Sequence, residues 1–290
     1  MMMQWYHYAL LTAFTLGIAD TLVKKAAEKN DEYTLTLVRL AYTLPFIIPA
    51  LFFIKIPPLD TTFFSAAAIA IPIDITALTL YQRAIKISPL SLTLPFLAFT
   101  PVFVVVTSFV LLEEIPNVNS LVGIVLVFLG VYLLNIHDIY GGFLEPLKSL
   151  KKEKGARIML IVAFLFSINI NVGKIMAIHS SPAFLATFYM AALAVSYVIF
   201  LIATGKTYAI KNLKNSPFLF SMIGLFVLIH SFTHFIAVTM TNVASMVSVK
   251  RTSVLFSIIF AAMFLKEFHC AERFIGTAVM ITGVWLIIVF

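Results

Sequence analysis

Ten apolar runs of about 20 residues follow one another along the chain, separated by charged residues, prolines or short polar clusters. A helix of that length crosses the hydrocarbon core of a bilayer. Because 61% of the 290 residues are hydrophobic and only 11% are charged, a soluble core could not bury the apolar surface. We therefore predict an all-α integral membrane protein with ten transmembrane helices. The predicted spans are residues 7–27, 33–54, 62–82, 89–111, 117–136, 157–178, 182–204, 216–239, 243–264 and 271–290.

The two halves of the chain match each other. Residues 111–134 align with residues 264–287 at a constant shift of 153, which pairs Glu114 with Glu267, two carboxylates predicted to anchor or cap a following helix. Each half holds five spans, an odd number, so the second half must enter the membrane from the opposite side. Such inverted repeats place a binding site near the midplane of the bilayer. The predicted organisation is a first five-helix repeat at residues 1–136, a central loop at 137–156 and a second five-helix repeat at 157–290.

Glycines recur at matched positions of the two halves. The shift of 153 pairs Gly123 with Gly276 and Gly130 with Gly283. Small residues allow helix backbones to approach closely inside a membrane. We predict that these glycines lie at a close helix contact.

Basic residues mark one face of the predicted bundle. Of 20 lysines and arginines, 15 flank the connections between spans 1–2, 3–4, 5–6, 7–8 and 9–10, whereas the opposite connections hold only Lys55. The positive-inside rule predicts that the basic connections are cytoplasmic and that both termini lie outside. The net charge of +7 is therefore read as a topology signal, and no nucleic-acid partner is predicted.

Lys250 and Arg251 stand side by side about seven residues into the ninth predicted span, in the stretch SVKRTSVLFSIIF. A charged side chain near mid-bilayer costs at least about 2.5–3.5 kcal/mol, so such residues rarely face lipid. Arg251 shares a helix face with Ser248, a small neighbour that leaves room for a cavity. All three are candidate substrate-binding residues. Pairing with a buried acid and snorkelling to the interface are the alternatives for the two charges.

Asp74, near the middle of the third span, is a candidate proton carrier, because burial disfavours the charged form of an isolated carboxyl group. The alternative is a counter-ion for one of the two cations. His230 and His234, four residues apart in the eighth span, share one face. They are candidates for cavity lining or for packing, and Tyr81 lies at the repeat-related position of His234. A metal site is not predicted, because no third ligand has a matching spacing.

Other polar residues inside spans are predicted to be structural. Asp20 and Lys24 are four residues apart in the first span and are expected to neutralise each other. Asn169, Asn171 and Lys174 occupy the matching part of the sixth span, where polar side chains often bridge helices.

The stretches LEEIPNVNSLVGIVLVFLGVYL, LKEFHCAERFIGTAVMITGVWL and AIKISPLSLTLPFLAFTPVF resemble the drug/metabolite transporter superfamily, EamA type, over nearly the whole chain. This resemblance implies a small-molecule carrier whose third, fourth, eighth and ninth spans face a cavity. Members usually have both termini in the cytoplasm, contrary to the charge distribution here. The ninth span also resembles that of sugar-phosphate translocators, which hold phosphate with a Lys-Arg pair. Their further lysine, in the fourth span, corresponds to Leu97.

These observations predict a secondary active transporter in the cell membrane, multi-pass, that moves a small polar, anionic metabolite by alternating access. An amino acid, an organic acid or a phosphorylated compound would fit, with a proton or counter-substrate as the coupled solute. One alternative is a proton-coupled exporter of hydrophobic or cationic drugs that uses Asp74. Another is a membrane-embedded enzyme, but no H-E-x-x-H or G-x-S-x-G motif occurs. We predict no enzymatic activity, no cofactor, and a monomer or homodimer.

Overall fold

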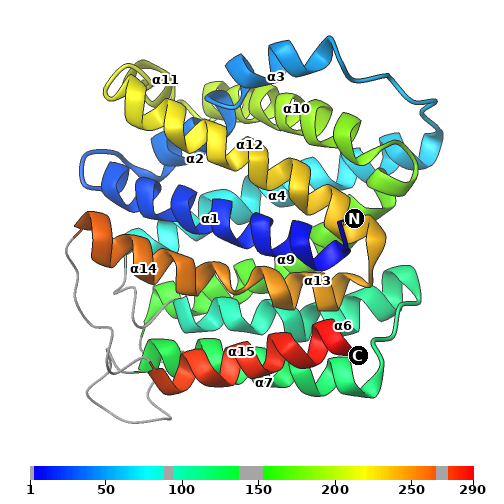
Figure 1. The fold of residues 1–290 in the computed structure, drawn as a ribbon. Helices are drawn as coiled ribbons and strands as arrows, with labels where there is room; N and C mark the ends of the chain where they lie inside the picture. Colours follow the sequence, from blue (N-terminus) through cyan, green and yellow to red (C-terminus); the bar gives the residue numbers. More distant parts are fainter. Residues whose placement is uncertain (1–2, 88–93, 137–152, 266–273) are drawn as a thin grey trace.

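The computed structural model describes residues 3–87, 94–136, 153–265 and 274–290, and within these ranges the chain is helical and contains no strand (Figure 1). The first half contains α1 (Trp5–Ala27), α2 (Glu32–Ala41), α3 (Leu44–Leu51), α4 (Thr61–Ile87), the 3-10 helix η1 (Leu94–Ala98), α6 (Phe99–Leu112) and α7 (Val118–Ile136). The second half contains α9 (Lys154–Ile178), α10 (Pro182–Ala203), α11 (Tyr208–Asn212), α12 (Pro217–Met240), α13 (Val243–Lys250), α14 (Ser253–Leu265) and α15 (Phe274–Val289).

Several described helices are long and apolar enough to cross a membrane. Five candidate spans qualify, and three shorter apolar helices accompany them. The five are Glu32–Ala50, Thr61–Ala84, Lys154–Ile178, Pro182–Ala203 and Pro217–Met240, and the shorter ones are Phe96–Leu112, Val118–Leu134 and Ile275–Val289. The described part of the chain is therefore helical throughout its regular structure, and several of its helices are suited to cross a membrane, as predicted.

Local caps explain where several helices begin. Asp31 precedes α2 and accepts a hydrogen bond from the backbone N–H of Thr34 at 2.7 Å. Asn242 precedes α13 and accepts one from Ser245 N at 2.8 Å. Both side chains satisfy an N–H group that would otherwise lack a partner in the first helical turn.

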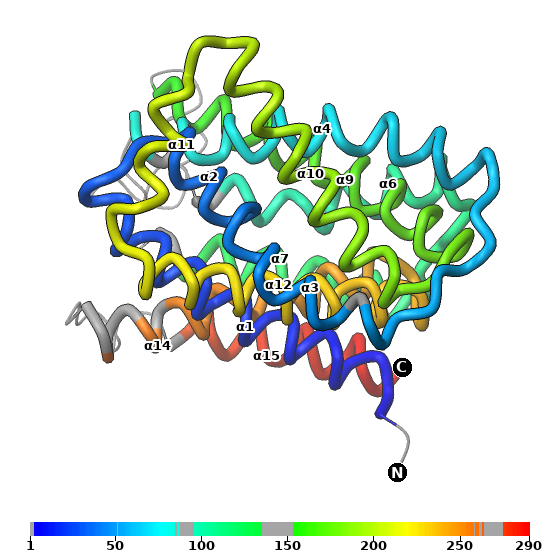
Figure 2. Tube along the Cα trace, turned by 90° about the horizontal axis from the view of Figure 1, so that it is seen from above, coloured from blue at the N-terminus to red at the C-terminus, as the bar shows by residue number. Residues whose placement is uncertain are grey.

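Helices of the first half pack mainly against helices of the second half. The most extensive contacts join α7 with α15, α4 with α9, and α1 with α12; α1 also packs on α14, and α6 on α9. Figure 2 shows two layers, with α4, α6 and α9 on one side and α1, α14 and α15 on the other. The space between these layers holds the cavity described below.

The four matched glycines lie at the contact between α7 and α15. A Cβ atom added at Gly123 would lie 2.7 Å from the carbonyl oxygen of Gly283, and one at Gly283 would lie 2.6 Å from that of Gly123. A Cβ at Gly276 would lie 2.9 Å from the carbonyl oxygen of Gly130. The predicted close helix approach is confirmed, because no larger side chain fits between these backbones.

An ion pair joins the halves at one end of the molecule. Lys174 Nζ of α9 lies 2.5 Å from Glu114 Oε1, just after α6, and donates a second bond of 2.6 Å to the carbonyl oxygen of Thr241. The other carboxylate oxygen of Glu114 accepts from Val243 N, the first residue of α13, at 2.9 Å. Glu114 therefore caps a helix of the other half, whereas its repeat partner Glu267 lies outside the described residues.

The two ends of the bundle differ in what they carry. In Figure 1 the chain termini lie on the right, together with the starts of α4 and α10. The C-terminal ends of α1 and α4, the start of α9, and α11 lie on the left. The described helix ends that flank the connections predicted to be basic lie at this left end (Figure 1).

Candidate functional site

A cavity of about 480 Å³ lies between the two helix layers. Small-molecule sites usually measure about 300–1,000 Å³, so this one can hold a metabolite. Its polar and charged lining residues are Asp20, Thr21, Lys24, Arg39, Asp74, Tyr81, Gln82, Asn169, Tyr189, His230, Ser231, His234, Lys250, Arg251, Ser253 and Ser257. Leucine, isoleucine, valine, methionine and phenylalanine side chains form much of the rest, including Leu97 and Phe166.

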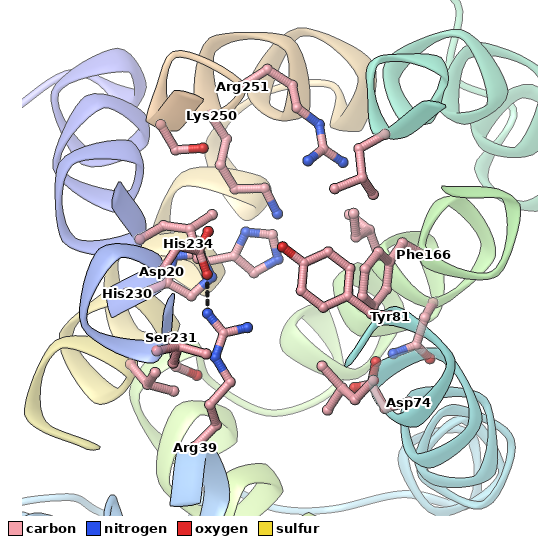
Figure 3. Close-up of a pocket in the computed structure, with 18 of the residues that line it drawn as sticks. Asp20, Arg39, Asp74, Tyr81, Phe166, His230, Ser231, His234, Lys250 and Arg251 are labelled. Atoms are coloured by element: carbon pink, nitrogen blue, oxygen red, sulfur yellow. Dashed lines mark hydrogen bonds and ion pairs between the residues drawn. The ribbon is translucent and has the colours of Figure 1, made fainter. Parts of the chain in front are cut away.

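The interruption between α13 and α14 brings Lys250 and Arg251 to the cavity. Lys250 is the last residue of α13, and Arg251 caps the helix, with its backbone N–H donating to the carbonyl oxygens of Val247 and Ser248 at 3.1 Å. Both side chains point into the cavity (Figure 3). Lys250 is 8% exposed. In the described part of the chain neither side chain forms an ion pair or a hydrogen bond, and Arg251 Nε is buried without a partner.

Arg39 of α2 reaches the same cavity from the opposite wall (Figure 3). Its Nη2 atom contacts Asp20 Oδ1 of α1, and the two side chains are 11% and 29% exposed. Arg39 Nε is buried and has no hydrogen-bond partner. The prediction that Asp20 is neutralised by Lys24 missed this partner, because Arg39 comes from a neighbouring helix. Lys24 also lines the cavity.

Asp74 of α4 lies on the cavity wall and is held by a tyrosine. The Tyr189 hydroxyl of α10 donates a 2.6 Å hydrogen bond to Asp74 Oδ2. Asn169 Nδ2 of α9 donates to the Tyr189 oxygen at 3.4 Å, whereas Asn169 Oδ1 is buried without a partner. Three helices thus meet around this carboxyl group. It forms no ion pair with Lys250 or Arg251.

The two histidines of α12 also line the cavity. His230 and His234 stack with ring centroids 5.8 Å apart and planes at 11°. His230 Nδ1 lies 3.2 Å from the carbonyl oxygen of Thr12, whereas His234 Nδ1 has no partner. Among the described residues no group of three or more histidine, cysteine or acidic side chains could hold a metal ion. The hydroxyl of Tyr81 points toward the middle of the cavity (Figure 3).

Most of the predicted site residues therefore meet in one place. Six of them line the cavity, namely Tyr81, Asp74, His230, His234, Lys250 and Arg251. The seventh, Ser248, is fully buried outside the cavity lining, and its hydroxyl donates to the carbonyl oxygen of Ala244 at 2.8 Å.

Sequence reasoning missed Arg39, Gln82 and Tyr189 as cavity residues. Arg39 carried a usable signal, because it is a single charge in the apolar run LTLVRLAYTLPF. Gln82 and Tyr189 are common polar residues of membrane helices, and only the packing of helices reveals their position. Gln82 Nε2 is buried without a partner.

Comparisons with known proteins agree with this architecture. Residues 3–136 match the EamA-like transporter family. A protein of Archaeoglobus fulgidus described as an uncharacterized transporter is 27% identical over 210 residues, which cover 72% of this chain and 69% of that protein. A solved structure described only as the crystal structure of a protein has a TM-score of 0.72 at 14% identity, covering 98% of this chain and 96% of the other. At that identity, the likeness to the solved structure concerns the fold alone.

Proposed function

We propose, on the premise that this chain is a multi-pass membrane transporter of the EamA-like family, that it carries a small anionic metabolite by secondary active transport. The observation that supports an anion is the pair Lys250 and Arg251, which face the cavity without a partner in the described residues. A buried cation without a counter-charge is costly. A substrate anion would supply that charge during part of the transport cycle.

Alternating access is the mechanism that we propose. The internal repeat makes α9 the counterpart of α1 and α12 the counterpart of α4, so the contact of α1 with α12 corresponds to the contact of α9 with α4. The contact of α7 with α15 joins two counterpart helices. This pattern supports ten spans arranged as two inverted five-helix repeats. Two similar halves can rock about a site between them, which exposes it to each side in turn.

Proton coupling through Asp74 is the second part of the proposal. The carboxyl group lies on the cavity wall and accepts a hydrogen bond from Tyr189, a residue of the other half. A proton on Asp74 would change this contact between the halves. We further propose that the basic connections are cytoplasmic, which puts both termini outside.

Counterflow in proteoliposomes tests the proposed function. Proteoliposomes that contain the purified protein are preloaded with an unlabelled organic acid, amino acid or phosphate ester. Uptake of the same compound in labelled form is then followed. Lys250→Gln and Arg251→Gln are each expected to reduce anion uptake by about tenfold or more, because a hydrogen bond to a charged group contributes about 1.5–3 kcal/mol. Arg83→Gln is the matched control, since Arg83 is exposed.

An exporter of hydrophobic cations is the second candidate, supported by Asp74 and by the aromatic side chains of the cavity wall. The same variants separate the two functions. Loss of positive charge at Lys250 and Arg251 should leave cation transport intact or increase it. That result, together with no anion counterflow in the unmodified protein, would refute anion transport.

A further inference from the structure

The cavity has cationic side chains on two opposing walls. Lys250 and Arg251 extend from the end of α13 on one side, and Arg39 extends toward them from α2 on the other (Figure 3). The resemblance to sugar-phosphate translocators implies a lysine where this chain has Leu97, and Leu97 does line the cavity. In this chain the third cation is Arg39 of α2, which lies on the wall opposite Lys250 and Arg251 (Figure 3).

Positive charge exceeds negative charge on this lining. The lining contains four cations, Lys24, Arg39, Lys250 and Arg251, against two acids, Asp20 and Asp74. The buried lining atoms without a partner are the donors Arg39 Nε, Gln82 Nε2 and Arg251 Nε, the acceptor Asn169 Oδ1, and Ser231 Oγ and His234 Nδ1, which can donate or accept. A ligand that completes this site must bring acceptors to both walls.

We propose that the cavity takes a small dianion whose two anionic groups are separated, such as a short dicarboxylate. One carboxylate binds Lys250 and Arg251, and the other binds the guanidinium group of Arg39, which contacts Asp20 through Nη2 in this structure. A single phosphate group would contact the cations of only one wall. This inference rests on the proposed function, because it names the anion that the same cavity carries.

Asp20 has a definite role in this arrangement. Its carboxylate contacts Nη2 of Arg39 and neutralises that cation when the second anionic group is absent. Asp20 and the substrate carboxylate therefore compete for one guanidinium group. Removing the acid should strengthen binding of a dianion and leave a monoanion unaffected, an outcome that a purely structural ion pair would not produce.

Three anions test the proposal. Succinate carries two separated carboxylates, and butyrate has the same number of carbons but one carboxylate. Methyl phosphate carries both negative charges on a single group. Binding to the purified full-length protein is measured by the rise in melting temperature with concentration, since a ligand that prefers the folded state raises it. Succinate should bind at least about tenfold more tightly than the other two, the factor that about 1.4 kcal/mol provides. Arg39→Gln should remove this preference, and Asp20→Asn should increase it.

Two further variants keep the test decisive. Arg39→Gln leaves Asp20 without its partner, so the double variant with Asp20→Asn removes both charges and should fold while showing equal binding of succinate and butyrate. Arg83→Gln should keep the preference of the unmodified protein. Equal binding of the three anions by the unmodified protein, or a succinate preference that survives loss of Arg39, would overturn the dianion site but not anion transport. Binding of none of these anions, with no anion counterflow, would overturn the proposed function itself.

Discussion

Replacing Glu114 by glutamine removes the carboxylate that holds Lys174, whose side chain is only 8% exposed. The lysine ammonium keeps its hydrogen bond to the carbonyl oxygen of Thr241 but loses its counter-charge. Breaking a buried ion pair costs about 3–5 kcal/mol, and the 22% exposure of Glu114 puts the expected loss near 3 kcal/mol. In glutamine one of the two carboxylate oxygens becomes an amide nitrogen, which donates hydrogen bonds and cannot accept them. Glutamine therefore cannot replace both the bond from Lys174 Nζ and the bond from Val243 N.

Lys174→Met should cost less than Glu114→Gln. The carboxylate left behind still accepts from Val243 N at 2.9 Å and is partly exposed to solvent. We expect a loss of about 1–2 kcal/mol, close to that of one hydrogen bond to a charged group. Lys154→Met, an exposed lysine at the start of the same helix α9, is the control and should change stability by less than about 0.5 kcal/mol.

Reversible unfolding in mixed detergent micelles, followed by circular dichroism, provides the free energies of unfolding. The double variant Glu114→Gln with Lys174→Met completes a thermodynamic cycle, and contacting residues should show an interaction energy of about 1–2 kcal/mol. The reasoning is refuted if Lys174→Met destabilises the protein more than Glu114→Gln does. An interaction energy within error of zero would show that the ion pair contributes nothing to holding the halves together.

Two other sites give sharp expectations. Gly130→Leu would place a Cβ atom 2.6 Å from the backbone nitrogen of Met280, so we expect a loss of about 1–3 kcal/mol in the free energy of unfolding of the purified protein. The backbone N–H of Phe63, and then the hydrogen bond with His179, lower the pKa of Asp60 from its ordinary value of 3.8. Because the folded-state value is the lower one, this stabilisation is present above about pH 3.8 and lost as the pH falls through the folded-state pKa. Asp60→Asn should remove this part of the acid dependence of the melting temperature, and an unchanged pH profile would contradict the assignment.

Charges inside apolar runs were the most informative feature of the sequence. Lys250, Arg251 and Asp74 stand out because a bilayer makes an exposed charge expensive, so their only tolerable positions are a cavity, an ion pair or the interface. The energetic cost of a charge in lipid is the same however the helices pack, and all three residues line the cavity. Arg39 carried the same signal.

Partners between helices could not be predicted, because local spacing identifies only neighbours on the same helix. The spacing of four residues predicts Lys24 as a partner of Asp20 but gives no sign of Arg39, which the packing of α1 against α2 brings to the same carboxylate. Helical periodicity predicts that Ser248 lies at the cavity, which its side chain does not line. The helix ends at Lys250, and the serine hydroxyl bonds back to the carbonyl oxygen of Ala244 within the turn. Neither outcome follows from hydropathy.

The contrast among the buried cations explains why the cavity points to a substrate. Arg39 and Lys174 each have a carboxylate partner, so the fold can neutralise a cation between its helices where stability requires it. Lys250 is buried to a similar degree, yet it has no such partner among the described residues. Leaving the Lys250 ammonium unpaired lowers the stability of the folded protein. An anion bound beside Lys250 during the proposed transport cycle would supply the missing counter-charge. Helix α13 holds Lys250 in place for this role, because Glu114 accepts a hydrogen bond at the start of the helix and Lys250 is its last residue.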